Sequence, residues 1–277
     1  MLIDDLGPLA TDYAHVYLSP HLDDATLSCG GAIAGQAARG EHVLVVTICT
    51  GAPPPAGPFS ALAESFHREW GLSAEQVLAV RLREDADASA TLGADSLCAG
   101  MLDAIYRHPA AYSSRATLFG APDPADPLLP ALRVYIAALR ERLPAATFYA
   151  PLGVGSHVDH LVTHTAATEL LGDSLCYYED FPYVARAGAL QLRLAELHGA
   201  LKPCSVEIAG SLERKITAIC AYTSQLPELA HSQLGRQVPN HEAAALFAAV
   251  VSDYALQVGD GIPAERLWSR EPIAGSR

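Results

Sequence analysis

The feature that most constrains the fold is the alternation of short apolar runs, rich in β-branched residues, with segments of helical composition. The runs HVYLS (15–19) and HVLVVTIC (42–49) are continuous and apolar. Such runs are typical of strands buried on both faces of a parallel sheet. The segment between them has helical composition and ends at Gly40, which suits the residue that follows a helix. This unit has the length of a β-α-β motif.

The same alternation continues along the chain. Ser73 and Gln76 form the pattern of a capping box, and Gly93 and Gly172 suit the ends of two predicted helices. Pro130 fits the first turn of another helix. The sequence therefore predicts an α/β fold with an open, mostly parallel, Rossmann-like sheet and helices on both faces. Further strands are expected at 96–101, 146–152, 174–179 and 204–209, and helices at 73–93, 130–143, 160–171, 212–222 and 241–256.

Two segments rich in proline and glycine interrupt this pattern. They span residues 51–60 and 120–130. Both follow strand or turn signals, so we expect surface loops, with the first at the rim of a site.

The charge and composition exclude some classes of partner. The net charge is −13 with a pI near 5.2, which disfavours nucleic acid and strongly anionic substrates unless a cation or metal receives them. The N-terminus lacks the pattern of a signal peptide, and no apolar stretch is long enough for a membrane span. The six cysteines are scattered without a CxxC pair, so we expect a reduced, cytoplasmic protein.

The stretch YLSPHLDD ends the first predicted strand with His21, Asp23 and Asp24. Ligands of open α/β sheets gather beyond the carboxyl ends of strands. Carboxylates and imidazoles there can bind Zn²⁺, and two neighbouring aspartates can divide metal binding and proton transfer. The alternative is that the aspartates cap a helix and complement its dipole; capping does not explain His21.

A second cluster follows the strand predicted at 146–152. The stretch GVGSHVDHLVTH contains His157, Asp159, His160 and His164, and on a helix its three histidines share one face. We interpret His164 as a surface histidine. His160 and His164 have the spacing of a zincin motif, but Leu161 stands where that motif requires glutamate.

Together the two clusters supply what a catalytic zinc site requires. Three protein ligands leave one position open for water. Spacing alone does not choose which two imidazoles bind the metal.

PHLDD, followed at a distance by HVDH, resembles the two motifs of the LmbE-like (PIG-L) zinc-dependent N-deacetylase family. The segments RLREDADASATLGA (81–94) and KITAICAYTSQ (215–225) resemble later parts of that family. The resemblance implies one α/β deacetylase domain over residues 1–277.

The resemblance also implies roles for individual residues. It makes His21, Asp24 and His160 the metal ligands, with another divalent metal as an alternative to zinc. Asp23 becomes the general base. His157, in its protonated form, stabilises the developing charge or protonates the leaving amine, and Asp159 orients it. Arg83 contacts substrate hydroxyls or a phosphate; the alternative for Arg83 is a surface salt bridge with Glu84.

Three positions depart from the family pattern. Leu22 replaces a proline, Ala25 replaces a glutamate, and Gly155 lies near the place of a tyrosine that assists the oxyanion. Tyr178 and Tyr183 are the candidates to replace that tyrosine. They belong to YYEDFPY (177–183), whose aromatic side chains either stack on a sugar or, as for Tyr177, pack in the core.

The function implied is removal of the acetyl group from an N-acetylated amino sugar, in an N-acetylglucosaminyl-type conjugate. One alternative is a zinc amidase that cleaves a larger acyl group from a sugar or thiol conjugate. Another is a sugar- or nucleotide-binding module without catalysis, although no GxGxxG or Walker A motif follows the first strand. The expected partner is a small N-acetyl sugar or glycoconjugate, and the sequence is compatible with a homo-oligomer.

Overall fold

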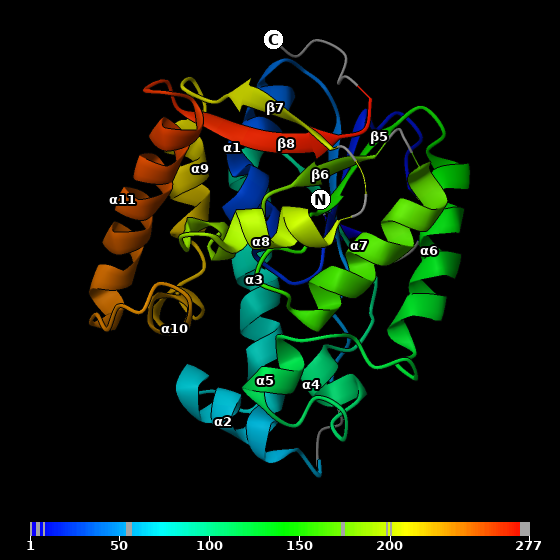
Figure 1. Cartoon of the computed structure of the whole chain (residues 1–277), viewed down its shortest axis with the longest axis vertical. Coiled ribbons are helices and arrows are strands. Elements are labelled where there is room, and N and C mark those ends of the chain that lie inside the picture. The colour runs from blue at the N-terminus through cyan, green and yellow to red at the C-terminus, as the bar shows by residue number, and fades with distance from the viewer. Residues whose placement is uncertain are drawn as a thin grey trace.

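Strands of the described residues form one sheet, with helices on both faces (Figure 1). The computed structural model describes residues 2–3, 6–7, 9–53, 57–172, 175–197, 199 and 201–271. Within these residues the sheet has eight strands in the order β1-β4-β3-β2-β5-β6-β8-β7. The strands are β1 Leu2–Ile3, β2 His15–Ser19, β3 Val43–Thr47, β4 Asp95–Cys98, β5 Thr147–Pro151, β6 Cys176–Tyr178, β7 Lys202–Glu207 and β8 Ala264–Ser269.

The sheet is parallel from β1 to β6 and antiparallel at β8 and β7. From β2 the chain first builds outward through β3 and β4, and it then returns to place β5 and β6 on the other side of β2. The strand order therefore reverses between β2 and β5. This switch point is where open α/β sheets form their ligand crevice.

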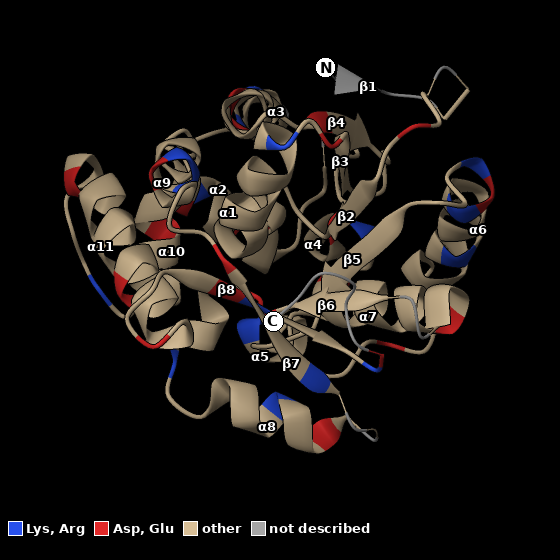
Figure 2. Ribbon diagram, turned by 90° about the horizontal axis from the view of Figure 1, so that it is seen from above, with Lys and Arg blue, Asp and Glu red and all other residues tan. Residues whose placement is uncertain are grey.

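Helices cover both faces of the sheet. Figure 2 shows α1, α3, α9 and α11 on one side and α6 and α7 on the other. The helices are α1 Asp24–Ala38, α2 Ala61–Trp70, α3 Ala74–Leu92, α4 Ala104–Arg107, α5 Arg115–Leu118, α6 Leu128–Arg142, α7 Val158–Leu171, α8 Ala189–Glu196, α9 Leu212–Ile219, α10 Leu226–Ser232 and α11 Asn240–Val258, with a 3₁₀ helix, η2, at Tyr183–Ala185.

The predicted α/β fold with an open, mostly parallel sheet is confirmed. β2 and β3 have five residues each, and all five residues of β3 are buried. The capping box at Ser73 and Gln76 is present, and Gly93 ends α3 with a φ of 82°. Sequence reasoning missed β1, β8 and the helices α2, α4, α5, α8 and α10.

The loops predicted at residues 51–60 and 120–130 have different outcomes in the structure. Residues 54–56 of the first loop lie outside the described residues, and its last residue, Ser60, caps α2. The second prediction is partly wrong, because Asp126 is buried and α6 already begins at Leu128. Asp126 accepts two hydrogen bonds from Arg107, at 2.7 and 2.8 Å, and this ion pair draws the segment inward.

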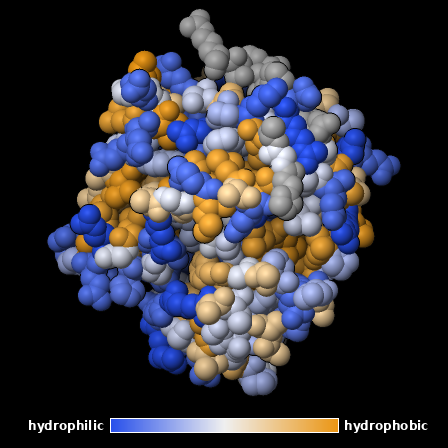
Figure 3. Space-filling model, viewed as in Figure 1, coloured by the Kyte–Doolittle hydropathy of each residue, from blue (hydrophilic) through white to orange (hydrophobic). Residues whose placement is uncertain are grey.

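Hydrophilic residues cover much of the face seen in Figure 3, with apolar areas between them. Among the helices of the described chain, none is both long and apolar enough to cross a membrane.

Candidate metal centre and active site

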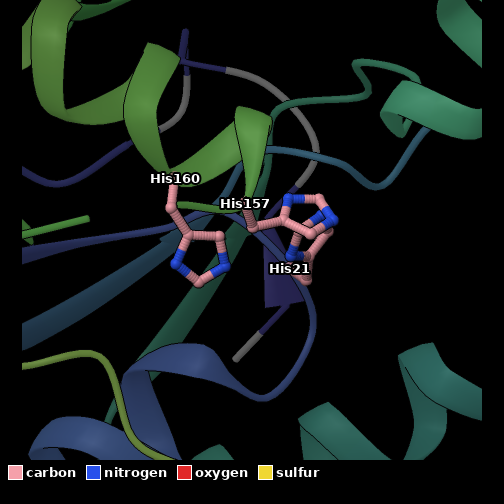
Figure 4. A group of neighbouring side chains, drawn as sticks. All are labelled: His21, His157 and His160. Atoms are coloured by element: carbon pink, nitrogen blue, oxygen red, sulfur yellow. The ribbon is translucent and has the colours of Figure 1, made fainter. Parts of the chain in front are cut away.

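The two predicted clusters meet at the switch point of the sheet. His21 lies in the turn after β2, and Asp24 is the first residue of α1. His157 caps α7, which follows β5, and His160 lies in the first turn of that helix. Figure 4 shows His157 and His160 projecting from the start of α7 toward the region of His21. The ring centroid of His21 lies 4.8 Å from that of His157 and 5.4 Å from that of His160.

One oxygen of Asp24 joins the two histidines predicted as ligands. Asp24 Oδ2 lies 3.2 Å from His21 Nδ1 and 3.2 Å from His160 Nε2. The same oxygen accepts the backbone N–H of His21 at 2.8 Å, which fixes the carboxylate at the start of α1. Three donor atoms of the kind that bind divalent metals therefore converge on one small volume.

The outward nitrogen of His160 is held by a carboxylate that the sequence analysis did not select. His160 Nδ1 lies 2.7 Å from Asp180 Oδ1. Asp180 Oδ2 accepts the backbone N–H groups of Gly153 and Val154 at 2.7 and 2.8 Å. This arrangement keeps the Nδ1 proton on the Asp180 side and leaves Nε2 to face Asp24, as in histidines that bind metals.

Asp159 holds the other nitrogen of His21. Its Oδ2 lies 3.0 Å from His21 Nε2 and accepts the backbone N–H of Ala104 at 3.1 Å. Its Oδ1 accepts a hydrogen bond of 2.6 Å from Arg107. Cys49 Sγ lies 3.6 Å from Asp159 Oδ2, and burial, reinforced by that carboxylate, raises the pKa of the Cys49 thiol to about 12. We therefore read Cys49 as a neutral donor to Asp159.

The residues fit a divalent cation. His160 Nε2 is buried and has no hydrogen-bond partner among the described residues, although it lies 3.2 Å from Asp24. An orphaned buried nitrogen costs free energy unless a ligand satisfies it. His21, His157 and His160 also offer ligand atoms within 4.8 Å of one another. The candidate sets that contain His160 share His21 and differ in whether Asp24 or His157 completes the group. A further group of close ligand atoms comes from His21, Cys49 and Asp159.

Asp23 is not a conventional helix cap. It occupies the N-cap position of α1, but in the described structure its side chain makes no cap hydrogen bond. Its backbone, with φ of 155° and ψ of −30°, lies in a region that residues other than glycine rarely adopt. Such backbone strain is concentrated at functional sites. Asp23 Oδ2 lies 3.6 Å from a guanidinium nitrogen of Arg81. Burial raises the pKa of Asp23 to about 7, against the opposing charge of Arg81.

The structure corrects two expectations about His157. Burial and the neighbouring charge of His21 hold the pKa of His157 well below its usual value. His157 Nδ1 accepts the backbone N–H of Asp159 at 3.3 Å, so the ring is neutral and carries its proton on Nε2. The carboxylate of Asp159, expected to orient His157, instead contacts His21 and Arg107.

His164 was expected at the surface, and that expectation is wrong. The residue is 7% exposed. Its Nδ1 hydrogen-bonds the carbonyl of Pro151 at 3.0 Å, and its ring lies 4.8 Å from that of Tyr177. Burial lowers the pKa of His164 to about 4, so it is a neutral histidine that ties α7 to the end of β5.

The arginine of α3 that reaches the cavity is Arg81. Arg83 is exposed, because residues two apart on a helix point about 200° apart. Its expected salt-bridge partner Glu84 is buried and instead accepts hydrogen bonds from Thr223 and Ser224. Arg83 therefore lies on the predicted helix but not on the face that lines the cavity, where Arg81 lies.

Asp103 is a second carboxylate that sequence reasoning missed. It follows β4, caps α4 by accepting the N–H of Ile105, and lines the cavity, as Arg81 does. Its Oδ2 lies 3.4 Å from His21 Nε2. The rule that ligands gather at strand ends could have selected it, as it could have selected Asp180 after β6.

Tyr183 is the candidate tyrosine that the structure brings to the cavity. Its ring centroid lies 5.6 Å from that of His160. It packs on Gly155, where an added Cβ would lie 2.6 Å from the ring of Tyr183. Tyr178 is fully buried and donates to the carbonyl of Leu18. Tyr177 is buried in the core, so the packing alternative holds for it.

Comparisons with known proteins show which proteins this chain is similar to. A family model described as "PIG-L: GlcNAc-PI de-N-acetylase" matches residues 16–171. A 2'-N-acetylparomamine deacetylase of Streptomyces fradiae is 29% identical, covering 94% of this chain and 90% of that protein. A protein of the same name from Niallia circulans is 29% identical, covering 61% of this chain and 67% of that protein.

A solved structure described as the zinc inhibited form of teicoplanin deacetylase is also similar. It matches with a TM-score of 0.74 and 26% identity, over 91% of this chain and 96% of that one. The predicted resemblance and the prediction of an N-deacetylase are confirmed. With a family model matching more than half of its residues, the chain belongs to the PIG-L family.

Proposed function

We propose that this protein is a metal-dependent hydrolase that removes the acetyl group from an N-acetylated amino sugar, in a conjugate of the N-acetylglucosaminyl type. The observation that carries this proposal is the placement of Asp24 Oδ2 within 3.2 Å of both His21 Nδ1 and His160 Nε2. Asp159 contacts His21 and Asp180 contacts His160. Asp23, which is buried and has a strained backbone, is the neighbour of Asp24 in the chain. The curated relatives, named as deacetylases of an N-acetylated sugar amine, support the same substrate class.

His21, Asp24 and His160 are the proposed ligands, with zinc as the proposed metal and another divalent ion as the alternative. A bound divalent cation lowers the pKa of a water molecule and polarises an amide carbonyl. The carboxylates of Asp159 and Asp180 orient the two imidazoles, so each presents its free nitrogen to the same point.

Asp23 is the proposed general base. Its pKa of about 7, raised by burial, is matched to proton transfer near neutral pH. Arg81 keeps the carboxylate in place and favours its ionised form. His157 is the proposed donor to the carbonyl oxygen as negative charge develops there, through the Nε2–H of a neutral ring.

The cavity above these residues suits a carbohydrate. Phe66, Trp70, Phe119 and Tyr183 line it together with charged and amide side chains. Aromatic side chains offer apolar faces to a sugar ring, and the polar groups between them can bind its hydroxyls. A larger acyl group in place of acetyl is the alternative that the assay below separates.

We also propose that residues 1–277 act as one domain in a reducing compartment such as the cytoplasm. The described strands share one sheet, and Cys29, Cys49, Cys176, Cys204 and Cys220 are in no disulfide bond. Thiols persist in reducing compartments.

The test combines metal analysis with product release. Purified protein is assayed for zinc and other divalent metals, and acetate release is measured on a panel of N-acetyl sugars, their conjugates and matched N-acyl analogues. We expect about one metal per chain, acetate release that chelation abolishes, and restoration by added metal. Metal-free protein that still hydrolyses the amide would contradict the proposal, and a preference for longer acyl groups would favour the amidase alternative.

A further inference from the structure

One guanidinium group joins the metal centre to a wall of the cavity above it. Arg107, the last residue of α4, has a side chain that is 6% exposed, and all three of its nitrogens donate hydrogen bonds. Nε and Nη2 bind the two oxygens of Asp126 at 2.7 and 2.8 Å. Nη2 also donates to Asp159 Oδ1 at 2.6 Å, and Nη1 donates to the carbonyl of Leu102 at 2.5 Å. Such a fork fixes the relative positions of its partners.

On the metal side, Arg107 fixes the carboxylate behind His21. Asp159 lies in the first turn of α7, and its side chain is fully buried. Its Oδ2 faces His21 Nε2 at 3.0 Å and accepts the backbone N–H of Ala104 at 3.1 Å. Its Oδ1 accepts from Arg107, so both oxygens are held. His21 Nδ1 faces Asp24, which makes Nε2 the nitrogen through which Asp159 orients the ring.

On the cavity side, Arg107 holds residues 103–126, called here the α4–α5 segment. Several residues of this segment line the cavity: Asp103, Ile105, Arg115, Leu118 and Phe119. Figure 1 shows α4 and α5, with α2, at the end of the molecule away from β7. Ile105 and Leu118 pack with Leu62 and Phe66 of α2 in a small hydrophobic cluster that is separate from the main core. The ion pair of Arg107 with Asp126 is therefore one of the contacts that fix this wall.

Asp126 anchors the end of the α4–α5 segment. Its side chain is 2% exposed. It accepts the hydroxyl of Tyr112 at 2.7 Å and the backbone N–H of Leu128, at the start of α6, at 2.8 Å. With the two bonds from Arg107, each oxygen of Asp126 accepts two hydrogen bonds. A buried, fully satisfied network of this kind is rigid, so Arg107 reaches the metal centre from a fixed point.

We propose that Arg107 is a positioning residue: by holding Asp159 it orients the proposed metal ligand His21, and by holding Asp126 it keeps the cavity wall in register with that metal centre. The inference rests on the proposed metal-dependent hydrolase and adds to it a residue that is not among those lining the cavity in the described structure. Replacing Arg107 should therefore alter both metal binding and substrate binding, whereas replacing Asp126 should alter substrate binding alone.

The first experiment is a double-mutant cycle on zinc affinity, measured by competition with a chromophoric chelator at one pH. Arg107→Lys keeps the positive charge near the metal, but one nitrogen replaces the fork of three. We expect its affinity to be about tenfold below wild type, and that of Asp159→Asn to be about 10–100-fold below. Because Arg107 acts through Asp159, Arg107→Lys should change affinity by less than about twofold in the Asp159→Asn background. Effects that multiply, or an unchanged affinity in folded Arg107→Lys, would overturn the inference.

The second experiment separates the two partners of the guanidinium. Asp126→Asn leaves Arg107 able to hold Asp159, so zinc affinity should stay within about twofold of wild type. KM for the best N-acetyl sugar should rise by about threefold or more, because the α4–α5 segment is less firmly held. Zinc affinity that falls as far as in Asp159→Asn, or an unchanged KM, would contradict the inference. This result decides the matter even if Arg107→Lys does not fold.

Arg133→Lys is the matched control. Arg133 lies on α6 and pairs with Glu169 at the surface, where its side chain is 45% exposed. Its zinc affinity and KM should equal those of wild type, and thermal melting establishes which variants are folded. The zinc titration does not depend on turnover. If no N-acetyl sugar is hydrolysed, the proposed function fails, and the cycle alone decides the role of Arg107. If the sugars are hydrolysed but the cycle shows no coupling, the inference fails while the proposed function stands.

Discussion

Asp180→Asn tests whether the carboxylate behind His160 controls metal binding. Asp180 is 1% exposed and uses both oxygens: Oδ1 faces His160 Nδ1, and Oδ2 accepts two backbone N–H groups. An asparagine can keep only one of these acceptors. With its oxygen retained toward the two backbone donors, its NH₂ group faces His160. A neutral His160 must then accept at Nδ1 and carry its proton on Nε2, the atom that faces Asp24.

The magnitude follows from this change of tautomer. Loss of a carboxylate behind a metal-binding histidine typically weakens metal affinity by about 10–100-fold. The effect must be separated from competition by protons. Burial lowers the pKa of His160, but Asp24 and Asp180 outweigh it and raise the pKa to about 9 in the metal-free protein. Below that pH a metal must displace the His160 proton, and this proton alone should weaken wild-type affinity by about tenfold for each unit that the pH falls.

The assay is a competition titration with a chromophoric chelator between pH 6.5 and 9.5. At pH 9.5 the His160 proton competes little, and competition by the His21 proton is common to both proteins, so the affinity of Asp180→Asn should be about 10–100-fold below wild type. Its affinity should also depend less steeply on pH, because the substitution removes a charge that raises the pKa of His160. Asp87→Asn, an exposed position on α3, is the control. Equal affinities at pH 9.5 in folded Asp180→Asn and wild type would refute the reasoning.

Three further predictions concern the cavity. Asp23→Asn should keep its metal while kcat falls by about 10²–10⁴-fold, since the amide cannot accept a proton; metal loss on dialysis would contradict this. Arg81→Gln should move the acidic limb of the kcat/KM profile to higher pH, because the charge that lowers the pKa of Asp23 is gone, whereas Arg83→Gln should leave the limb in place. Gly155→Ala should lower the free energy of unfolding by about 1–3 kcal/mol, because the added methyl group meets the Tyr183 ring and φ is positive; an unchanged melting temperature would contradict this prediction.

The ends of β2 and β5 were predictable from sequence because they combine two signals. A continuous apolar run locates a buried strand, and histidines next to aspartates directly after it are unusual for a helix cap. Asp103 and Asp180 follow β4 and β6 in the same way. Each stands there as a carboxylate without a neighbouring histidine, and Asp103 does cap a helix. Their part in the site follows from the strand order, which the local sequence does not specify.

Strand β8 was missed for a related reason. Its sequence AERLWS places Glu265 in a buried strand, and a lone glutamate argues against burial. The structure compensates this charge with Lys215 of α9 at 2.6 Å and with the backbone N–H groups of Gly31 and Ala32 at 2.9 and 2.8 Å. These partners lie far away in sequence. Only the packing of α1 and α9 against the sheet brings them together.

The same dependence on tertiary partners explains why the site holds so many carboxylates. Burial favours the neutral form of an acid, yet Asp24 and Asp159 are held ionised by the histidines and by Arg107. In the metal-free protein, protons on His21 and His160 balance the negative charge of these carboxylates, since the carboxylates raise the pKa values of both histidines. A divalent cation at Asp24 would replace those protons and satisfy the orphaned Nε2 of His160. The carboxylates behind the histidines therefore orient the imidazoles for a metal, and in its absence they favour the protonated imidazoles.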